Sequence, residues 1–473
     1  MRRTKIVATI GPASRDPDTL LAMVTAGMDV ARLNYSHGTL EEHAETAQRV
    51  REAAGRGGRP VAILQDLPGP KLRIGPLRDG VVELQVGHRL RFSGGPTDDD
   101  DAALGDVDHM SVSWPGIAEA LTPGAVIYLA DGSVRLRVVE VSLATAEIEA
   151  EIEVGGAIAS RQGMNVPGPV DSLPSVPEED LALLRHGESI GVDLVALSFV
   201  RRPEDVQFVR QHTRLPLIAK IEKPQAVEQA TEILREADCV MVARGDLGIE
   251  LPIEQVPMVQ KRLLRLAGQL ARPSITATQM LDSMVTSSRP TRAEVADVAN
   301  AILDGTDAVM LSQETAVGAH PVGAIAMMAA VAVEAEKQAP YHEWNQSRVH
   351  RDGRDPAYTL AHSLCVAARE LELDAIVVPT LSGRSARLVS AHRPQVPIYA
   401  LSPGRETVRR CGLMWGVEAA SIRRHETTEA LIADAARRVV ELGWCQPGQR
   451  VGLTAGLPSG RPGTTSLMQI QVL

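Results

Sequence analysis

Eight short apolar segments recur along this chain, and each of them ends in polar or charged residues. Between most of them apolar residues return at the spacing of one helix face, which predicts an amphipathic helix after each strand. Neighbouring parallel strands need such crossover helices, and eight strand-helix units close into a (β/α)8 TIM barrel. We therefore predict an α/β fold built on this barrel. The eight segments are 5–10, 30–36, 61–66, 194–200, 217–222, 240–246, 274–279 and 308–314.

The rhythm breaks between the third and the fourth segment, where far more chain intervenes than between the others. This stretch consists of short alternating runs separated by turns such as Asp79-Gly80 and Asp131-Gly132, which is typical of a small antiparallel β domain. After the eighth segment helices and strands alternate again and predict an open α/β unit. The predicted domains are a barrel of residues 1–68 and 171–340, an inserted small β-barrel domain of residues 69–170 and a C-terminal α/β domain of residues 355–473.

The composition excludes several functional classes. The net charge is -10 and aromatic residues make up 3% of the chain, so basic tracts and stacking rings for a nucleic acid are lacking. The start of the chain carries no apolar signal core and no long uncharged segment follows, so we expect a cytoplasmic protein without a membrane contact. The four cysteines lie far apart without a C-x-x-C pair, which favours buried thiols over zinc ligands or disulfides.

Active sites of TIM barrels lie at the carboxyl ends of the strands. Lys220 and Glu222 stand two residues apart at one such end and therefore point to the same face, and Asp246 ends the next segment. Two carboxylates at one rim repel each other unless a cation neutralises them, so this group predicts a divalent cation beside an anionic substrate. Ordinary solvated strand ends are the alternative. The other polar residues expected at this rim are Arg32, Asn34, Ser36, His37, Asp66, Ser198, Thr278 and, with salt-bridged structural roles as an equal alternative, Arg201, Arg244 and Glu314.

Cationic side chains near this rim favour a phosphorylated substrate, namely Arg32, Lys71, Arg73 and Lys220. Phosphoryl transfer needs mainly positioning and charge neutralisation, which such a site supplies. The chain has neither a G-x-x-x-x-G-K-[ST] loop nor a G-x-G-x-x-G turn that opens a helix after a strand. A nucleotide would therefore be held by another arrangement.

Several long motifs resemble pyruvate kinase, and they occur in the right order at residues 4–14, 31–38, 219–222, 241–248, 277–280 and 289–294. The resemblance extends through the inserted and the C-terminal domains. It implies a phosphotransferase of glycolysis that transfers the phosphoryl group of phosphoenolpyruvate to ADP, giving pyruvate and ATP, and that assembles as a homotetramer. Another Mg2+-dependent barrel enzyme, such as a mutase or an aldolase, should lack the lid and the C-terminal domain. A catalytically silent ligand sensor should have lost Lys220, Glu222, Asp246 or Thr278, and all four are present.

The resemblance also implies roles for individual residues. Glu222 and Asp246 would hold Mg2+ or Mn2+. Lys220 would stabilise the enolate oxygen as the phosphoryl group leaves, and Arg32 would contact the transferring phosphate. The catalytic residues that the resemblance implies are Lys220, Thr278 and Arg32.

Further contacts implied by the resemblance concern the two substrates. The backbone at Gly245 and Asp246 and the hydroxyl of Thr278 would hold the substrate carboxylate, and Ser312 would help Thr278 to order the water that protonates the enolate. The inserted domain would close over the site as a lid. The expected nucleotide contacts are Asn34, His37 and Arg73, whereas Gln162 stands where a lysine is frequent and weakens one such contact.

A monovalent-cation site is implied at Asn34, Ser36, Asp66 and the carbonyl of Leu67. The chain departs from the family next to this site, because Lys71 stands where many members have a glutamate. An ammonium there could supply the positive charge that K+ otherwise provides. We therefore predict that K+ is dispensable.

The segment 380–385 follows a predicted strand and opens a predicted helix, a geometry suited to phosphate. It resembles the effector loop of the family, with residues 455–463 as a second wall, whereas a plain strand-to-helix turn is the alternative. A sugar phosphate and a nucleotide monophosphate are both compatible effectors. The residues expected in this loop are Thr380, Ser382, Gly383, Arg384 and Ser385.

Overall fold

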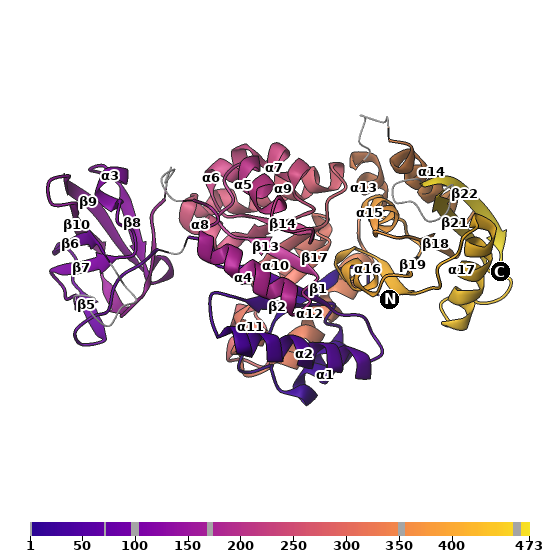
Figure 1. Ribbon diagram of the computed structural model, residues 1–473, viewed down its shortest axis with the longest axis horizontal. Coiled ribbons are helices and arrows are strands. Elements are labelled where there is room, and N and C mark those ends of the chain that lie inside the picture. The colour runs from indigo at the N-terminus through magenta and orange to yellow at the C-terminus, as the bar shows by residue number, and fades with distance from the viewer. Residues whose placement is uncertain (1, 71, 96–103, 168–173, 349–354, 457–464) are drawn as a thin grey trace.

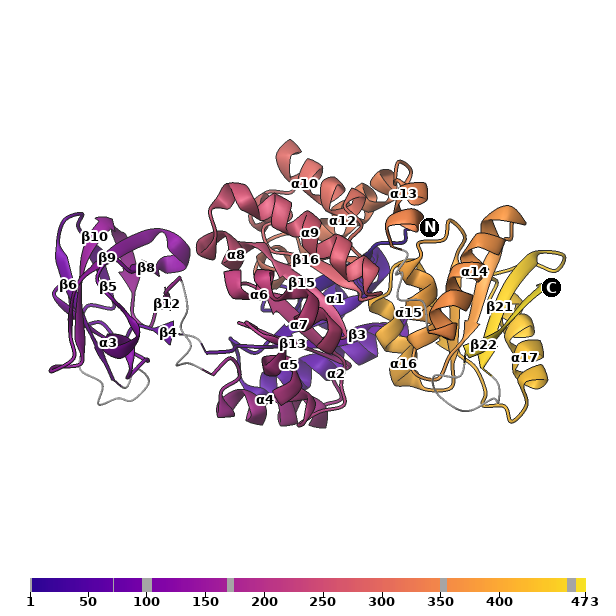
Figure 2. The same ribbon diagram turned by 90° about the horizontal axis from the view of Figure 1, so that it is seen from above.

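A computed structural model of the chain describes residues 2–70, 72–95, 104–167, 174–348, 355–456 and 465–473. Three bodies lie in a row, with the inserted β domain at one end, the barrel in the centre and the C-terminal domain at the other end (Figure 1, Figure 2). No helix among those described combines the length and the apolar character that are needed to cross a bilayer.

The central barrel is closed, and its eight strands run parallel in the order β1-β17-β16-β15-β14-β13-β3-β2, which confirms the predicted fold class. The strands are buried on both faces, because side chains such as Val7, Leu64 and Met241 fill the interior while the alternate residues pack against the surrounding helices. The strands are β1 (Lys5–Thr9), β2 (Val30–Asn34), β3 (Ala62–Leu67), β13 (Leu194–Leu197), β14 (Leu217–Ile221), β15 (Cys239–Ala243), β16 (Ser274–Ala277) and β17 (Ala308–Leu311).

Several barrel helices begin at residues whose side chains cap them. The Thr39 hydroxyl accepts the N–H of Glu42, whose carboxylate accepts the N–H of Thr39, and Thr291 and Glu294 form the same capping box on α10. The helices around the barrel are α1 (Pro17–Ala26), α2 (Leu40–Arg56), α4 (Glu178–Ser189), α5 (Pro203–Arg210), α6 (Pro224–Glu228), α7 (Ala230–Glu236), α8 (Arg244–Glu250), η2 (Ile253–Gln255), α9 (Val256–Gln269), η3 (Asp282–Val285), α10 (Arg292–Leu303), α11 (Gln313–Ala316) and α12 (Pro321–Glu336).

The amino ends of the barrel strands carry a repeated feature that we call the strand clamp. An aspartate directly precedes every second strand, and its carboxylate accepts the backbone N–H of a residue at the start of the strand before it. Asp193 accepts from Ile63 at 2.9 Å. Arginine side chains pair with each of these carboxylates and offset the cost of burying the charge. The other clamps are Asp29 to Ile6 at 2.8 Å, Asp238 to Leu217 at 3.0 Å and Asp307 to Ser274 at 2.9 Å.

The inserted domain is a sheet of seven strands in the order β4-β12-β8-β9-β10-β6-β7, with a two-stranded sheet of β11 and β5 beside it. Its strands pair antiparallel as predicted, except that β6 and β7 run parallel. A bridge between Ile74 and Val112 joins its two edges, so that the sheet nearly closes around a core of its own. The elements are β4 (Leu72–Arg73), β5 (Val81–Leu84), β6 (Arg89–Gly94), β7 (His109–Val112), α3 (Ile117–Ala120), β8 (Val126–Leu129), η1 (Ala130–Gly132), β9 (Val134–Ser142), β10 (Glu147–Val154), β11 (Gly156–Ala159) and β12 (Gly163–Asn165).

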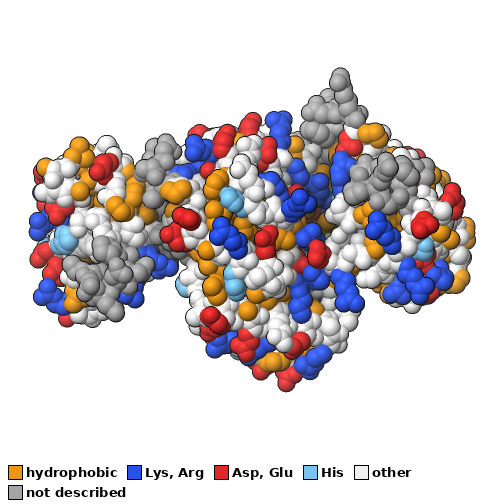
Figure 3. Space-filling model, in the orientation of Figure 1, with side chains coloured by type: hydrophobic (Ala, Val, Ile, Leu, Met, Phe, Trp, Pro, Cys, Tyr) orange, Lys and Arg blue, Asp and Glu red, His pale blue; other side chains and the backbone are white. Residues whose placement is uncertain are grey.

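The C-terminal domain has a five-stranded sheet in the order β20-β19-β18-β21-β22, parallel except for the last strand. Strand β20 was not predicted, because only Val417 of its five residues is buried and the run lacks an apolar pattern. A band of Lys and Arg side chains lies over the junction of this domain with the barrel (Figure 3). The elements are α13 (Tyr341–Ser347), which leads into the domain, α14 (Pro356–Glu370), β18 (Ala375–Pro379), α15 (Arg384–Ala391), β19 (Ile398–Ser402), α16 (Arg405–Arg410), η4 (Cys411–Leu413), β20 (Val417–Ser421), α17 (Thr428–Glu441), β21 (Arg450–Gly456) and β22 (Thr465–Val472).

Candidate active site

Lys220 occupies the centre of the polar rim at the carboxyl ends of the barrel strands. Its ammonium lies 2.9 Å from Oε1 of Glu222 and 3.3 Å from Oδ1 of Asp66, and it donates a hydrogen bond of 2.6 Å to Oγ of Ser198. The Ser198 hydroxyl in turn donates to the carbonyl of Leu67 at 2.7 Å. Residues on β14 and β3, together with those that follow β14 and β13, therefore converge on one buried ammonium.

The surroundings of Lys220 keep it charged. Burial alone would lower the pKa of its ammonium, but the carboxylates of Asp66, Glu222 and Asp246 outweigh burial and raise the pKa above its usual value. Burial would likewise raise the pKa of the Asp66 carboxyl, yet Lys220 and Arg32 hold that pKa below its usual range. A fixed, buried cation is suited to stabilise negative charge that develops on a substrate.

Arg32, in the middle of β2, is a second buried cation on this rim. Its Nε donates to Oδ2 of Asp66 at 2.7 Å, and its Nη1 donates to Oγ1 of Thr9 at 2.9 Å. Asp66 therefore lies between Arg32 and Lys220 and uses a different oxygen for each. This carboxylate fixes the relative position of the two cations.

Glu222 and Asp246 form the carboxylate pair that was predicted to hold a metal. The Oε2 of Glu222 accepts the N–H of Phe199 at 2.7 Å. Burial raises the pKa of the Glu222 carboxyl, and although Lys220 opposes this effect, Asp246 adds to it and the net shift is upward. One ammonium therefore does not fully compensate the two carboxylates.

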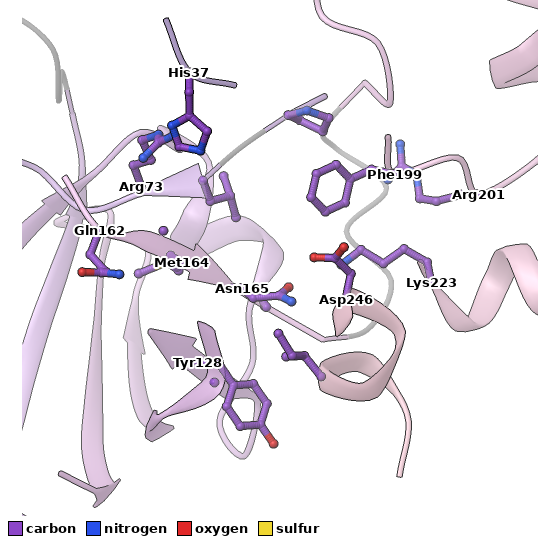
Figure 4. Close-up of a pocket in the computed structure, with 16 residues that line it drawn as sticks. His37, Arg73, Tyr128, Gln162, Met164, Asn165, Phe199, Arg201, Lys223 and Asp246 are labelled. Atoms are coloured by element: carbon purple, nitrogen blue, oxygen red, sulfur yellow. The ribbon is translucent and has the colours of Figure 1, made fainter. Parts of the chain in front are cut away.

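Asp246 does not end a strand as predicted, because β15 ends at Ala243 and Asp246 lies in the first turn of α8. Its carboxylate makes no hydrogen bond or ion pair with another described residue, and it points into the cleft between the barrel and the inserted domain (Figure 4). Because the Asp246 carboxylate has no described partner, its oxygens are available to an incoming cation.

Thr278 follows β16 in a strained conformation. Its φ is +68° and that of Gln279 is +52°, in the left-handed region that costs a β-branched residue on the order of 1–3 kcal/mol. The strain places Oγ1 of Thr278 where it accepts the N–H of Gly245 at 2.7 Å. A Cβ at Gly245 would lie 3.3 Å from that oxygen, so the close approach favours glycine.

Ser312, which precedes α11, carries a buried hydroxyl without a hydrogen-bond partner among the described residues. Its backbone N–H donates to Oε2 of Glu314 at 2.7 Å, and Oε1 of Glu314 accepts the N–H of Leu281 at 3.1 Å. Glu314 therefore holds two loops in place, a structural role that rests on backbone N–H groups and not on the salt bridge considered for it. Arg244 is also structural, because it pairs with Asp297 at 2.7 Å.

The cleft between the barrel and the inserted domain encloses a cavity of about 340 Å3. Figure 4 shows Asp246 and Lys223 on the barrel side of this cavity and Gln162 and Met164 on the side of the inserted domain. A second hollow of about 740 Å3 adjoins it, since His37 lines both. Other residues of the second hollow are Pro12, Arg32, Asn34, Gly38, Glu42, His43, Thr278 and Ser312.

Comparison with known proteins decides the family. The family model described as "Pyruvate kinase, barrel domain" matches residues 1–325, and "Pyruvate kinase, alpha/beta domain" matches residues 358–471. The chain is 42% identical over 478 aligned residues to a pyruvate kinase of Geobacillus stearothermophilus, with 100% of this chain and 80% of the relative covered. The chain belongs to the pyruvate kinase family. It is 40% identical to a pyruvate kinase of Staphylococcus aureus, again over its whole length and 81% of the relative.

The fold of the pyruvate kinase family extends over the whole molecule. A crystal structure of a pyruvate kinase from Cryptosporidium parvum superimposes with a TM-score of 0.91 at 34% identity, covering 100% of this chain and 96% of that one. The chain is thus a phosphotransferase of glycolysis. The mutase or aldolase alternative predicts a barrel without the inserted and C-terminal domains, and both are present.

Three groups of the predicted monovalent-cation site make bonds within the protein. Asn34 Oδ1 accepts the N–H of Ser36 at 3.2 Å, Asp66 pairs with the two cations described above, and the carbonyl of Leu67 accepts from Ser198. Lys71, which the prediction on K+ concerns, lies outside the described residues.

The predicted effector loop opens helix α15 with Gly383 in the left-handed region at φ +83°. The N–H of Gly383 donates to Oγ1 of Thr380 at 3.0 Å, and Ser385 Oγ lies 2.7 Å from Oγ1 of Thr465. Arg384 pairs with Asp355 from the connector. Ser382 is exposed. Of the predicted second wall, residues 457–463 lie outside the described residues.

One ion pair in the cleft escaped the sequence analysis. Lys223 pairs with Glu250 of α8 and lies 5.5 Å from the centre of the Phe199 ring. Glu250 follows Asp246 at helical spacing i, i+4, which could have indicated that both carboxylates face one side of α8. The partner of Glu250 is distant in sequence, and that contact required the fold.

Proposed function

We propose that the rim around Lys220 transfers the phosphoryl group of phosphoenolpyruvate to ADP. The observation that carries this proposal is the buried ammonium of Lys220, held between Asp66, Glu222 and Ser198 and within electrostatic range of Asp246, which lines the cleft. As the bond between the enol oxygen and phosphorus breaks, negative charge grows on that oxygen. A permanent, desolvated cation stabilises this charge more in the transition state than in the ground state.

The remaining groups of the rim would hold phosphoenolpyruvate and deliver a proton to it. Arg32 faces the second hollow and would contact the transferring phosphate, while the backbone at Gly245 and Asp246 and the hydroxyl of Thr278 would bind the carboxylate. The enolate left after transfer needs a proton on carbon to become pyruvate. The unpartnered hydroxyl of Ser312 supports its proposed role in ordering the water that supplies this proton.

Glu222 and Asp246 fit a divalent metal ion. Their carboxylates are imperfectly neutralised by Lys220, and Asp246 has no partner among the described side chains. No group of three or more His, Cys, Asp or Glu side chains in the described part of the chain is arranged to hold a metal ion by itself, and Mg2+ commonly takes one or two carboxylates, with waters and substrate phosphates completing the shell. Bound there, Mg2+ or Mn2+ would neutralise charge on the phosphoryl and enolate oxygens.

The nucleotide is proposed to enter along His37, which lines both hollows, with Asn34 and Arg73 as further contacts. Arg73 lies in β4 at the root of the inserted domain and donates to the carbonyl of Arg161 at 3.1 Å. Movement of that domain would carry Arg73 towards the phosphates. Closure as a lid is therefore part of the proposal.

Formation of pyruvate that requires both ADP and Mg2+ tests the function. Purified chain is incubated with phosphoenolpyruvate, ADP and MgCl2, and pyruvate is followed through lactate dehydrogenase and NADH. We expect turnover that disappears when ADP is left out or EDTA is added. A folded chain that forms no pyruvate under these conditions would overturn the proposal.

We predict that activity persists without K+, with tetramethylammonium as the sole monovalent cation. Lys71 stands where many family members have a glutamate, and its ammonium would supply the positive charge that K+ otherwise provides. Its sequence neighbours Pro70 and Leu72 line the cleft. The variant Lys71→Glu provides the matched comparison and should become activated by KCl. Wild-type activity that rises manyfold when KCl is added contradicts the prediction.

A homotetramer and a phosphorylated effector at residues 380–385 complete the proposed function. Apolar side chains on the edge strand β22, Met468, Ile470 and Val472, are partly exposed, which supports contact with another subunit. The glycine turn between β18 and α15 supports a phosphate contact. A cytoplasmic location stays a prediction.

A further inference from the structure

The strand clamp of Asp193 is held from the C-terminal domain. Its side chain is fully buried, and Oδ2 accepts both the N–H of Ile63 at 2.9 Å and Nη2 of Arg51 at 2.6 Å. The other oxygen, Oδ1, accepts Nε of Arg409 at 2.7 Å. Arg409 belongs to α16, so a residue of another domain completes the set of donors around this carboxylate.

The two strands joined by this clamp end at the partners of Lys220. Ile63 lies in β3, which carries Asp66 near its other end, and β13 begins directly after Asp193 and leads to Ser198. Three or four residues of extended chain, which span roughly 10–13 Å, therefore separate the clamp from Asp66 on β3 and from Ser198 after β13. Both strands are buried, and close-packed strands transmit a shift at one end rather than absorb it.

Helix α16 is fixed to its own domain, so the position of Arg409 follows the position of that domain. The hydroxyl of Thr407 donates to the carbonyl of Leu381, in the loop before α15, at 2.8 Å. In both views α16 lies on the side of the C-terminal domain that faces the barrel (Figure 1, Figure 2). One short helix thus contacts the loop of residues 380–385 and the clamp of β3 and β13.

A second clamp has the same construction. Arg393, which follows α15, lies 3.1 Å from Oδ1 of Asp307, whose carboxylate joins β16 to β17. These strands lead to Thr278 and Ser312. By contrast, the clamp of Asp29 is held by arginines from the amino-terminal half of the barrel. The Asp238 clamp is likewise held by barrel arginines, so that of the four clamps only those of Asp193 and Asp307 are paired with described arginines of the C-terminal domain.

We propose that Arg409 is a positioning residue for catalysis: through Asp193 it sets the placement of Asp66 and Ser198, and through them that of the Lys220 ammonium. This inference rests on the proposed role of Lys220. Its rival is a purely structural role in which Arg409 fastens two domains together. The two roles differ in whether loss of Arg409 changes turnover beyond its effect on stability.

The test compares Arg409→Gln with Arg387→Gln. Arg387 is also a C-terminal-domain arginine that docks on the barrel, where it donates to the carbonyl of Ala271 at 2.7 Å. It forms no ion pair with a described clamp carboxylate, although its charge is within range of Asp238. We expect Arg409→Gln to lower kcat by about twofold to thirtyfold, the range of couplings carried through packed elements, with KM for ADP unchanged. Arg387→Gln should keep the wild-type kcat. Equal kcat values in the two variants, at matched thermal stability, would overturn the proposal.

A double-mutant cycle with Ser198→Ala tests whether Arg409 acts on catalysis through the Lys220 ammonium. Ser198→Ala removes the hydrogen bond to Lys220, and if Arg409 acts through the same ammonium the two losses in kcat should be less than multiplicative. Independent, multiplicative losses would show that Arg409 does not act through Lys220. If Ser198→Ala alone leaves kcat unchanged, Ser198 does not position Lys220 and the positioning proposal is wrong. The role of Lys220 itself is tested separately by Lys220→Met, which distinguishes the two failures.

Hydrogen exchange gives a readout apart from activity. Loss of Arg409 should speed amide exchange in residues 61–67, because the N–H of Ile63 is bound by the released carboxylate. If Arg409→Gln does not fold, Arg409→Lys is used in the same double-mutant cycle. The lysine ammonium can form the one hydrogen bond to Oδ1 of Asp193, so we expect a kcat between those of wild type and Arg409→Gln. Unchanged exchange in residues 61–67 together with wild-type kcat would overturn the proposal in either variant.

Discussion

Replacing Lys220 by methionine is expected to lower kcat for pyruvate formation by a factor of about 10^3 or more, the scale measured when a group that stabilises transition-state charge is removed. The ammonium is buried, permanently charged and within 3.3 Å of both Asp66 and Glu222. Water cannot readily replace the ammonium, because the position is buried. The measurement is ADP-dependent pyruvate formation at saturating phosphoenolpyruvate.

Two controls separate chemistry from folding in this experiment. Lys261→Met removes a partly exposed lysine that pairs with Asp304, and it should keep the wild-type kcat. Lys220→Arg retains a positive charge beside Asp66 and Glu222 but presents a larger, planar group, so it should fold better than Lys220→Met and still be much slower than wild type. Activity of Lys220→Met within tenfold of wild type, in a folded protein, would remove Lys220 from the mechanism.

The second large effect is expected for Asp246→Asn. This carboxylate lines the cleft, lies close enough to Glu222 to raise its pKa, and has no partner among the described side chains. Its replacement should weaken binding of Mn2+, used as a paramagnetic substitute for Mg2+, by at least about tenfold to a hundredfold, since even outer-shell changes at metal sites cost that much. Because no internal contact is lost, the melting temperature without metal should change little.

The metal prediction is checked by electron paramagnetic resonance of free Mn2+ during titration, which needs no turnover. The matched control is Glu254→Gln, an exposed carboxylate beyond the same helix, which should bind Mn2+ as wild type does. Equal Mn2+ affinity in Asp246→Asn and Glu254→Gln would show that Asp246 is not a ligand. Weaker binding with unchanged kcat at saturating metal would limit its role to affinity.

Much of the fold followed from periodicity. Helices were expected between the apolar segments, and α2 (Leu40–Arg56) lies between the second and the third of them, where its cap at Thr39 marks its start. The strand ends were less accurate, because Arg244 to Asp246 and Ser312 to Glu314 continue apolar strands in sequence but turn into short helices. An apolar run does not reveal where its backbone leaves the sheet, since barrel closure decides which residues still find a strand partner.

The four clamp aspartates illustrate a different limit. Each of them precedes an apolar run, and such a position also suits an ordinary turn residue, so nothing in the pattern singled out Asp193. Its partners Ile63 and Arg409 are separated from it by 130 and 216 residues. Contacts over such distances depend on how the domains pack, which local spacing does not encode.

By itself the sequence determined the type of fold, the rim on which the polar residues gather and the chemistry that those residues can perform. Alternation within strands and charge at their ends are local properties, so one chain is enough to show them. The tertiary structure decided which charges meet: it set Lys220 between Asp66 and Glu222, raised its pKa by that enclosure, and connected the C-terminal domain to the same strands. Electrostatic strength depends on distance and burial, and both are defined only when the barrel has closed.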